Sequence, residues 1–126
     1  MKATPVQDNR SHPPRQRVRR EEIVNTVRQI VEHFRPLKVI LFGSYAYGTP
    51  VDGSDVDMLV VTDTPLKETQ QAVEICQAIH YDFGLDLIVR TPHTITERIK
   101  LGDPFMLEII EKGKVLYESA DDRMGE

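Results

Sequence analysis

The sequence predicts an α/β (α+β) domain in which helices pack on a small mixed β-sheet, and three observations lead to this fold class. The 126 residues suit one domain. A hydrophobic content of 40% beside a charged content of 29% is typical of a globular protein with an apolar core. Short, apolar, β-branched runs alternate with longer segments of helical period, in the order helix, strand, strand, helix, strand, helix, helix, strand.

The N-terminal part is expected to contain a leader and the first helix. Residues 1–16 are polar and hold three prolines, which predicts a disordered basic leader. Either a solvated tail or an arm that touches RNA or a partner fits this composition. Over residues 17–34 the apolar positions fall on one stripe of 3.6-residue period, which predicts a helix that ends before Pro36.

Two strands and a polar loop are expected next. The apolar run 39–42 ends at Gly43 and has the composition of a buried strand. Glycine, serine, proline and aspartate are frequent in residues 43–54, which predicts a loop. The second strand is expected over 55–61, followed by a turn at 62–65.

The rest of the chain is expected to alternate helices and strands. A helix over 66–81 precedes a strand over 85–89, and a capping-box pattern at 94–97 predicts a short helix that runs to residue 99. Asp103 followed by Pro104 predicts the start of another helix, which Gly113 closes. The run 114–118 is expected to be an edge strand before a frayed acidic tail over 119–126. The domain itself is therefore expected over 17–118.

The charge of the chain is unevenly distributed. Residues 1–20 hold six bases and one acid, a net charge of +5, and the remaining 106 residues hold ten bases and nineteen acids, a net charge of −9. An acidic body argues against strong nucleic-acid binding by the folded domain. A protein that handles polyanions on such a body needs to offset the repulsion, and bound metal ions are one way to do so.

No segment of the sequence predicts a membrane span or a secretion signal. The apolar runs are shorter than the roughly 18–20 residues of a transmembrane helix, and no apolar segment follows the N-terminal charges. The single cysteine, Cys76, excludes an internal disulfide, which agrees with a reducing compartment. A cytoplasmic protein without a membrane partner is therefore expected.

Two aspartates at the start of the second predicted strand indicate a cation site. Side chains alternate along a strand, so Asp55 and Asp57 share one face with their backbones about 6.6 Å apart. Adjacent carboxylates repel each other unless a cation neutralises them, and oxygen ligands suit Mg²⁺ or Mn²⁺ rather than zinc.

A third carboxylate is expected beside this pair. Asp86 lies in the apolar run 85–89, where an acid without a partner is unusual. If the two strands pair, Asp86 comes within several ångströms of Asp55 and Asp57. Three acids on two strands can hold two Mg²⁺ ions, the arrangement that clamps an in-line phosphoryl or nucleotidyl displacement.

The turn that ends the first strand is a candidate phosphate site. Gly43 lets the backbone approach a phosphate, and Ser44 can donate its hydroxyl and its N–H. A P-loop is excluded because no Gly-Lys-Ser/Thr follows, and the residue offsets of an EF-hand are missing. Residues 52–55 also fit an ordinary polar turn, an interpretation that leaves Asp57 and Asp86 unexplained.

Gly-Ser, ten further residues and Asp-x-Asp, with a third aspartate on a later strand, resemble the nucleotidyltransferase superfamily that shares the fold of DNA polymerase β. The length and layout are similar to those of its minimal nucleotidyltransferases. These proteins accompany helical HEPN-domain partners in prokaryotic toxin–antitoxin pairs. The resemblance covers about residues 20–118.

The resemblance implies a role for each of these residues. Asp55 and Asp57 would hold the two Mg²⁺ ions that bind the nucleoside triphosphate. Asp86 would ligate the catalytic ion and help to deprotonate the acceptor hydroxyl. Gly43 and Ser44 would contact the β- and γ-phosphates. The acceptor hydroxyl would attack the α-phosphate and release pyrophosphate.

The sequence departs from the family pattern at one position. Many minimal members carry Gly-Ser-x-Ala-Arg-Gly, whereas this chain has Tyr47 in place of the arginine, so a fixed positive charge near the phosphates is missing. The metal ions or Arg90, just past the third predicted strand, would compensate. Tyr45 and Tyr47 are expected either to contact a base or a partner, or to pack within the loop.

Three functions follow and stay open at this point. The first is an enzyme that moves a nucleoside monophosphate, in the first instance AMP from ATP, onto a hydroxyl of a HEPN-type partner and so acts as an antitoxin. The second is a non-catalytic antitoxin that neutralises its partner by occlusion, which Tyr47 favours. The third is a small-molecule adenylyltransferase, which the lack of a visible second domain disfavours. A homo-oligomer is compatible with each.

Overall fold

The structure, a computed structural model, describes residues 17–120. Its elements follow the chain in this order: α2 (Arg20–Phe34), β1 (Lys38–Phe42), the 3₁₀ turn η1 (Gly43–Tyr45), β2 (Val56–Val61), α3 (Glu68–Ala78), β3 (Leu85–Arg90), α4 (Pro92–Lys100), α5 (Pro104–Lys112) and β4 (Lys114–Glu118). The predicted order of helices and strands is confirmed. The predicted leader, residues 1–16, and residues 121–126 of the predicted tail lie outside the described residues.

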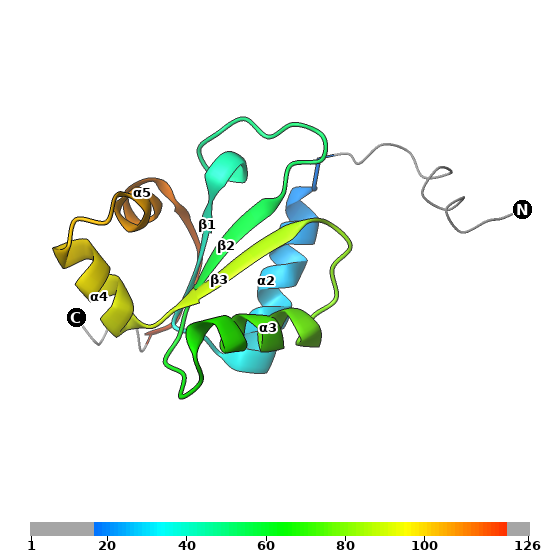
Figure 1. The fold of residues 1–126 in the computed structure, drawn as a ribbon. Coiled ribbons are helices and arrows are strands. Elements are labelled where there is room, and N and C mark those ends of the chain that lie inside the picture. The colour runs from blue at the N-terminus through cyan, green and yellow to red at the C-terminus, as the bar shows by residue number, and fades with distance from the viewer. Residues whose placement is uncertain (1–16, 121–126) are drawn as a thin grey trace, which may run out of the picture.

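The four strands form one mixed sheet in the order β3-β2-β1-β4 (Figure 1). Strand β1 runs antiparallel to both β2 and β4, whereas β2 runs parallel to β3. The parallel pair follows from its connection, because α3 crosses over between the two strands and returns the chain to the same end of the sheet. The predicted mixed sheet and the predicted edge position of the last strand are both confirmed.

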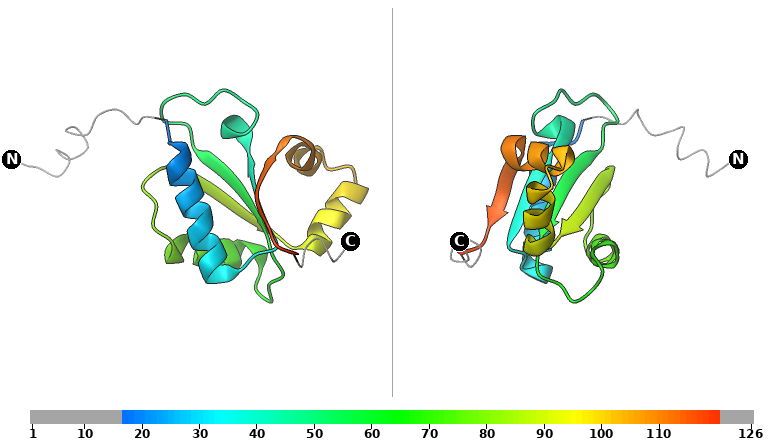
Figure 2. Two further views of the ribbon diagram at one scale, coloured as in Figure 1. Left: turned by 180° about the vertical axis from the view of Figure 1, so that it is seen from behind. Right: turned by 60° about the vertical axis from the view of Figure 1, so that its left-hand side comes forward.

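Helices cover both faces of this sheet (Figure 2). On one face, Ile30 of α2 and Ile75 of α3 are fully buried in a core that includes Met58 of β2. On the other face, Met106 of α5 is buried in a second core with Leu59, the next residue of β2. Because successive side chains of a strand point to opposite faces, the apolar run of β2 supplies both cores. Among the helices of residues 17–120, none has the length and apolar character of a transmembrane segment.

One helix start differs from its prediction. Helix α4 begins at Pro92, and the Thr91 hydroxyl caps it by accepting the N–H of Thr94 at 3.1 Å. The predicted capping box, with Thr94 as the cap, is therefore wrong, because an earlier threonine followed by a proline competes successfully for the cap position. Helix α3 is also shorter than predicted, since Ile79 already has extended backbone.

Helix α5 is held at both ends in the way the sequence predicts. The Asp103 carboxylate accepts the N–H of Phe105 at 2.9 Å and that of Met106 at 3.5 Å. At the other end, a Cβ on Gly113 would lie 2.6 Å from a methyl carbon of Ile40, so only glycine lets the helix end this close to β1. These contacts fix the position of α5 over the sheet.

Removal of the cap is expected to loosen α5. Asp103→Ala deletes both side-chain hydrogen bonds, so we expect the free energy of unfolding in urea to fall by about 1 kcal/mol. Asp63→Ala is the control, because Asp63 is exposed in the loop between β2 and α3 and caps no helix. The control is expected to change the free energy by less than about 0.5 kcal/mol. Equal losses in the two variants would contradict the capping role.

Candidate active site

Two carboxylates lie side by side at one end of the sheet. Asp57 of β2 is in register with Asp86 of β3, and on its other side Asp57 is in register with Phe42, the last residue of β1. Neighbouring strands are about 4.8 Å apart, and register partners project from the same face of a sheet. The predicted pairing of the two aspartate-bearing strands is therefore confirmed. Asp57 is half-buried, whereas Asp86 is exposed.

Asp55 lies just outside this pair. Strand β2 begins at Val56, one residue later than predicted, so Asp55 precedes the strand and is exposed. It still acts on Asp57: burial raises the pKa of Asp57, and the negative charges of Asp86 and then Asp55 raise it further. The repulsion among the three acids is therefore concentrated at the Asp57 carboxyl.

The turn after β1 brings backbone against Asp57. Gly43 has a φ of +74°, a conformation that glycine adopts readily and other residues do not, and a Cβ at this position would overlap the Asp57 carboxylate. The Gly43 carbonyl accepts the N–H of Ala46 and that of Tyr47, each at 3.0 Å, which closes the turn. Two independent constraints therefore require glycine beside the carboxylate.

Ser44 and Gly48 lie against each other in the same loop. Ser44 is the middle residue of η1, and a Cβ on Gly48 would come within 2.8 Å of the Ser44 Cα. The loop therefore folds back on itself and keeps Ser44 directly behind the end of β1. Gly43, Ser44 and the aspartate pair thus share one end of the sheet.

Tyr47 follows this turn directly, and its side chain is 37% exposed. Burial is the largest cause that raises the pKa of Tyr47, the carboxylates of Glu108 and Asp57 raise it further, and the Gly43 backbone lowers it in part. The Tyr47 phenol therefore lies within the electrostatic reach of Asp57 and of Glu108 on α5.

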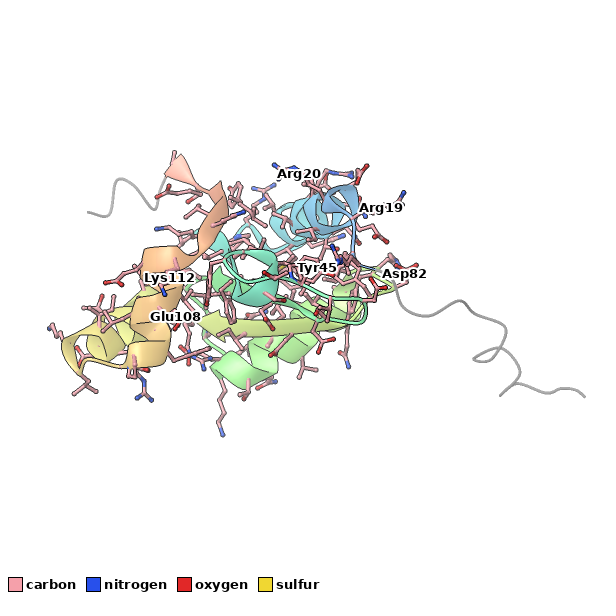
Figure 3. The ribbon with its side chains drawn as sticks, turned by 90° about the horizontal axis from the view of Figure 1, so that it is seen from above. Arg19, Arg20, Tyr45, Asp82, Glu108 and Lys112 are labelled. Atoms are coloured by element: carbon pink, nitrogen blue, oxygen red, sulfur yellow. The ribbon has the colours of Figure 1, made fainter. Side chains whose placement is uncertain are left out.

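Glu108 is a site residue that the sequence did not single out. One turn earlier on α5, Phe105 packs edge-on against Phe42 with ring centroids 5.7 Å apart. Residues three apart on a helix share a face, so this contact sets Glu108 beside the turn that follows Phe42. Seen from above, α5 with Glu108 lies next to the η1 turn that carries Tyr45 (Figure 3). The sequence offered only the helical spacing from Phe105, which does not say where α5 packs.

Tyr45 packs within the molecule, which was one of its two expected roles. Its hydroxyl accepts the N–H of Val18 at 2.8 Å, and its ring packs against the core under α2 and α3. Arg17 forms an ion pair with Asp52 of the same loop at 3.8 Å. The segment that leads into α2 is therefore attached to the loop that contains the candidate phosphate site.

Arg90 is the predicted site residue that the structure keeps apart from the others. It is in register with Val61 at the far end of β3, four residues from Asp86, or about 13 Å along the strand. Its guanidinium donates to the carbonyl of the neighbouring Val89 at 2.7 Å. In this arrangement Arg90 does not replace the charge that Tyr47 lacks, because the strand direction carries it away from the Gly43 turn.

The donor set of the aspartate pair suits a hard cation that is shared with a substrate. Within residues 17–120, no three His, Cys, Asp or Glu side chains converge closely enough to hold an ion by themselves. The predicted cluster of Asp55, Asp57 and Asp86 is therefore not a ready three-ligand cage. Mg²⁺ is commonly bound through one or two carboxylates, with substrate phosphates and waters as its other ligands. The in-register pair fits that mode of binding.

Comparison with known proteins gives an independent result. Residues 20–117, which include both aspartates of the pair and Glu108, match the nucleotidyltransferase domain family. Two relatives from Methanocaldococcus jannaschii are described as candidate protein adenylyltransferases. MJ0604 is 32% identical over 82 residues, or 64% of this chain and 77% of that protein. MJ1305 is 31% identical over 88 residues, or 65% of this chain and 58% of that protein. Among solved structures, a mutant of the toxin–antitoxin MntA-HpeT is similar at 20% identity and a TM-score of 0.49, over 85% of this chain and 80% of that one.

Alanine at Gly43 is expected to disturb the site more than alanine at Gly53. Both glycines have a positive φ, but a Cβ on Gly53 (φ +89°) would meet nothing within 4 Å. Gly53→Ala should therefore cost only the backbone strain, about 1 kcal/mol of unfolding free energy, whereas Gly43→Ala should cost at least about 1 kcal/mol more. Combination with Asp57→Ala should remove that excess. An excess that survives in the double variant would show that Asp57 is not its cause.

Neutralisation of Asp57 is expected to stabilise the protein when no divalent cation is present. Because the pKa of Asp57 is raised in the folded state, the folded protein loses stability as the pH rises from the ordinary value of 3.8 through the raised pKa. Asp57→Asn removes this penalty, so the variant should be the more stable protein at pH 7, with an advantage that shrinks toward pH 3. Urea unfolding in EDTA at pH 7 and at pH 3 measures the free energy of unfolding of the wild type and of Asp57→Asn, with Asp63→Asn as the exposed control. A less stable Asp57→Asn at pH 7 would refute the repulsion.

Proposed function

This chain belongs to the nucleotidyltransferase domain family, and from that premise we propose that it is an adenylyltransferase that moves AMP from ATP onto a hydroxyl of a partner protein. The observation that carries the proposal is the in-register pair Asp57 and Asp86 beside the Gly43 turn. The pair has the charge and the oxygen donors for Mg²⁺, and the turn offers backbone N–H groups to a phosphate. The two relatives described as candidate protein adenylyltransferases support a protein acceptor.

We assign the following roles to the residues of the site. Ser44 and the backbone of the turn would bind the β- and γ-phosphates, and Asp57 and Asp86, with Asp55 nearby, would hold Mg²⁺. When bound, Mg²⁺ would neutralise phosphate charge and make the α-phosphorus easier to attack. Asp86 would accept the proton of the acceptor hydroxyl while the oxygen of that hydroxyl bonds to the α-phosphorus. The bond from the α-phosphorus to the bridging oxygen would break, and pyrophosphate would leave.

The acceptor that we propose is a HEPN-domain protein, for which this chain would be the antitoxin. The support is the resemblance of the Gly43–Ser44 and Asp55-x-Asp57 pattern to minimal nucleotidyltransferases, which accompany such partners. The exposure of Asp86 agrees with it, because a hydroxyl on a large acceptor has to reach this carboxylate from outside. The proposed location is the cytoplasm, in agreement with the single cysteine of the sequence.

A non-catalytic antitoxin is the second candidate. Tyr47 favours it, because this side chain stands where the family pattern has an arginine and so brings no positive charge to the turn. In that case the same surface would neutralise the partner by occlusion. One experiment separates the two candidates.

We expect label from α-labelled ATP to move onto the product of the neighbouring gene, as the proposed HEPN-domain partner, when Mg²⁺ is present. Asp57→Asn should reduce the labelling at least about a hundredfold, since it removes one of the two carboxylates that hold the ion. Asp63→Asn, at an exposed position away from the sheet end, should label the partner as the wild type does. Wild type and Asp57→Asn that neutralise the partner equally well without label would establish the non-catalytic candidate instead.

A further inference from the structure

We propose that a groove between α2 and β4 is the surface on which the acceptor protein docks, and that it binds an amphipathic helix with acidic residues beside its apolar face. The apolar part of this α2–β4 groove is formed by Val24, Val31, Leu116 and Tyr117. The inference rests on the proposed function, because the docked protein is the acceptor of the nucleotidyl group. It adds a protein-binding surface that is separate from the aspartate pair.

The first observation is an apolar groove along the open edge of the sheet. Strand β4 is at one end of the strand order, and α2 crosses the face of the sheet beside it (Figure 2). The groove between the two elements has a volume of about 500 Å³. A second hollow of about 460 Å³ shares Val31 and Tyr117 with it and extends to Arg35 and Leu37. The α2–β4 groove therefore follows α2 over most of its length.

The second observation is that a helix fits this groove better than a strand. Helix α2 has 15 residues, so a groove along it offers about 22 Å, the length of an ordinary helix in a globular protein. Strand β4 is irregular opposite Val39 and Ile40, where its register with β1 shifts. Such irregularities at a sheet edge disfavour the addition of a further strand. A docked helix would instead lie beside α2 and extend the layer of helices that α2 and α3 form on this face.

The third observation is the charge around the groove. Three exposed arginines line it and its extension, namely Arg20, Arg28 and Arg35, and Glu32 is the only acid among the described lining residues. Within residues 17–120, none of these arginines takes part in an ion pair. The chain from residue 21 onward has a net charge of −9, so this basic surface differs in sign from the rest of the domain. Charge complementarity therefore favours an acidic partner.

The same charges disfavour occupants from this protein itself. A two-fold contact between two copies would place the same surface on both sides, so Arg20, Arg28 and Arg35 would face one another. Residues 1–16 hold three bases and one acid, which is again the sign of the groove. A different protein that supplies carboxylates avoids both repulsions.

The groove and the aspartate pair lie on opposite faces of the sheet. Asp57 shares a face with its register partner Phe42, which packs in the core under α5. Val27 of α2 belongs to the other core, and Leu116 packs against that core. A protein in the groove therefore leaves Asp57 accessible, and docking is expected to need neither Mg²⁺ nor ATP.

The test measures docking separately from catalysis. Val24→Glu places a carboxylate in the apolar part of the groove, so the dissociation constant for the product of the neighbouring gene, measured by titration calorimetry in EDTA, should rise at least about tenfold. Val73→Glu is the matched control, because Val73 is a helical valine outside the groove and is 54% exposed, against 48% for Val24. The control, like Asp57→Asn, should bind the product as the wild type does.

A second pair of variants tests the charge. Arg28→Glu should weaken binding about tenfold at low salt, and the loss should shrink as salt screens the charges. Arg98→Glu makes the same change at an exposed position of α4 and should have no effect.

The outcomes distinguish the docking surface from the proposed function. Val24→Glu and Arg28→Glu that bind as tightly as the wild type, while the wild type labels the product, would overturn the inference and leave the proposed function intact. Groove-dependent binding without label would retain the docking surface and overturn the enzyme. Absence of binding in the wild type would overturn both.

Two further results would identify a different occupant and so overturn the inference. The first is a mass, measured by sedimentation, that doubles with concentration in the wild type but not in Val24→Glu, which would identify a second copy. The second is tighter binding of the product after Asp121→Asn is combined with Asp122→Asn, which would identify the acidic residues 121–126 of the same chain.

Discussion

The parallel pairing of β2 with β3 places two like charges next to each other, and the rest of the site depends on that contact. Parallel neighbours carry residues of equal register on the same face, so Asp57 and Asp86 cannot turn away from each other without a change of register. A slip of β3 by one residue would bring Leu85 or Leu87 beside Asp57 and would turn Leu87 and Val89 out of the core under α2 and α3. The apolar packing of the sheet therefore enforces the electrostatic repulsion.

Strand β1 adds a second constraint on the residues around Asp57. Because β1 is antiparallel to β2, the chain leaves β1 at the same end at which the aspartates stand, and Gly43 has to turn there with its backbone against Asp57. Only a residue without a Cβ fits, and its positive φ directs the chain into η1. A carboxylate pair and a bare backbone turn thus meet at one sheet end, which is the combination that a cation and a phosphate need together.

The sequence predicted those parts of the site that depend on local pattern. Strand alternation and an unusual acid in an apolar run identified Asp57 and Asp86, and the glycine after β1 marked the turn. It did not place Arg90, because residue spacing alone does not give the end of the sheet at which a side chain emerges. Glu108 was missed for a related reason: its place depends on the packing of Phe105 against β1, a contact between segments that are far apart in the sequence. Local chemistry and the pairing of the two aspartate-bearing strands were thus predictable, whereas the packing of α5 against the sheet was not.

The repulsion between Asp57 and Asp86 lowers the stability of the cation-free fold and at the same time favours the binding of a cation. A carboxylate pair that is partly buried destabilises the cation-free fold, and any ion that binds between the two aspartates returns that free energy as affinity. Tyr47 has the opposite effect on the phosphate turn, since it stands where the family pattern has an arginine and leaves the turn without that fixed positive charge. The cation that the aspartate pair favours is therefore the charge on which a phosphate at this turn would have to depend.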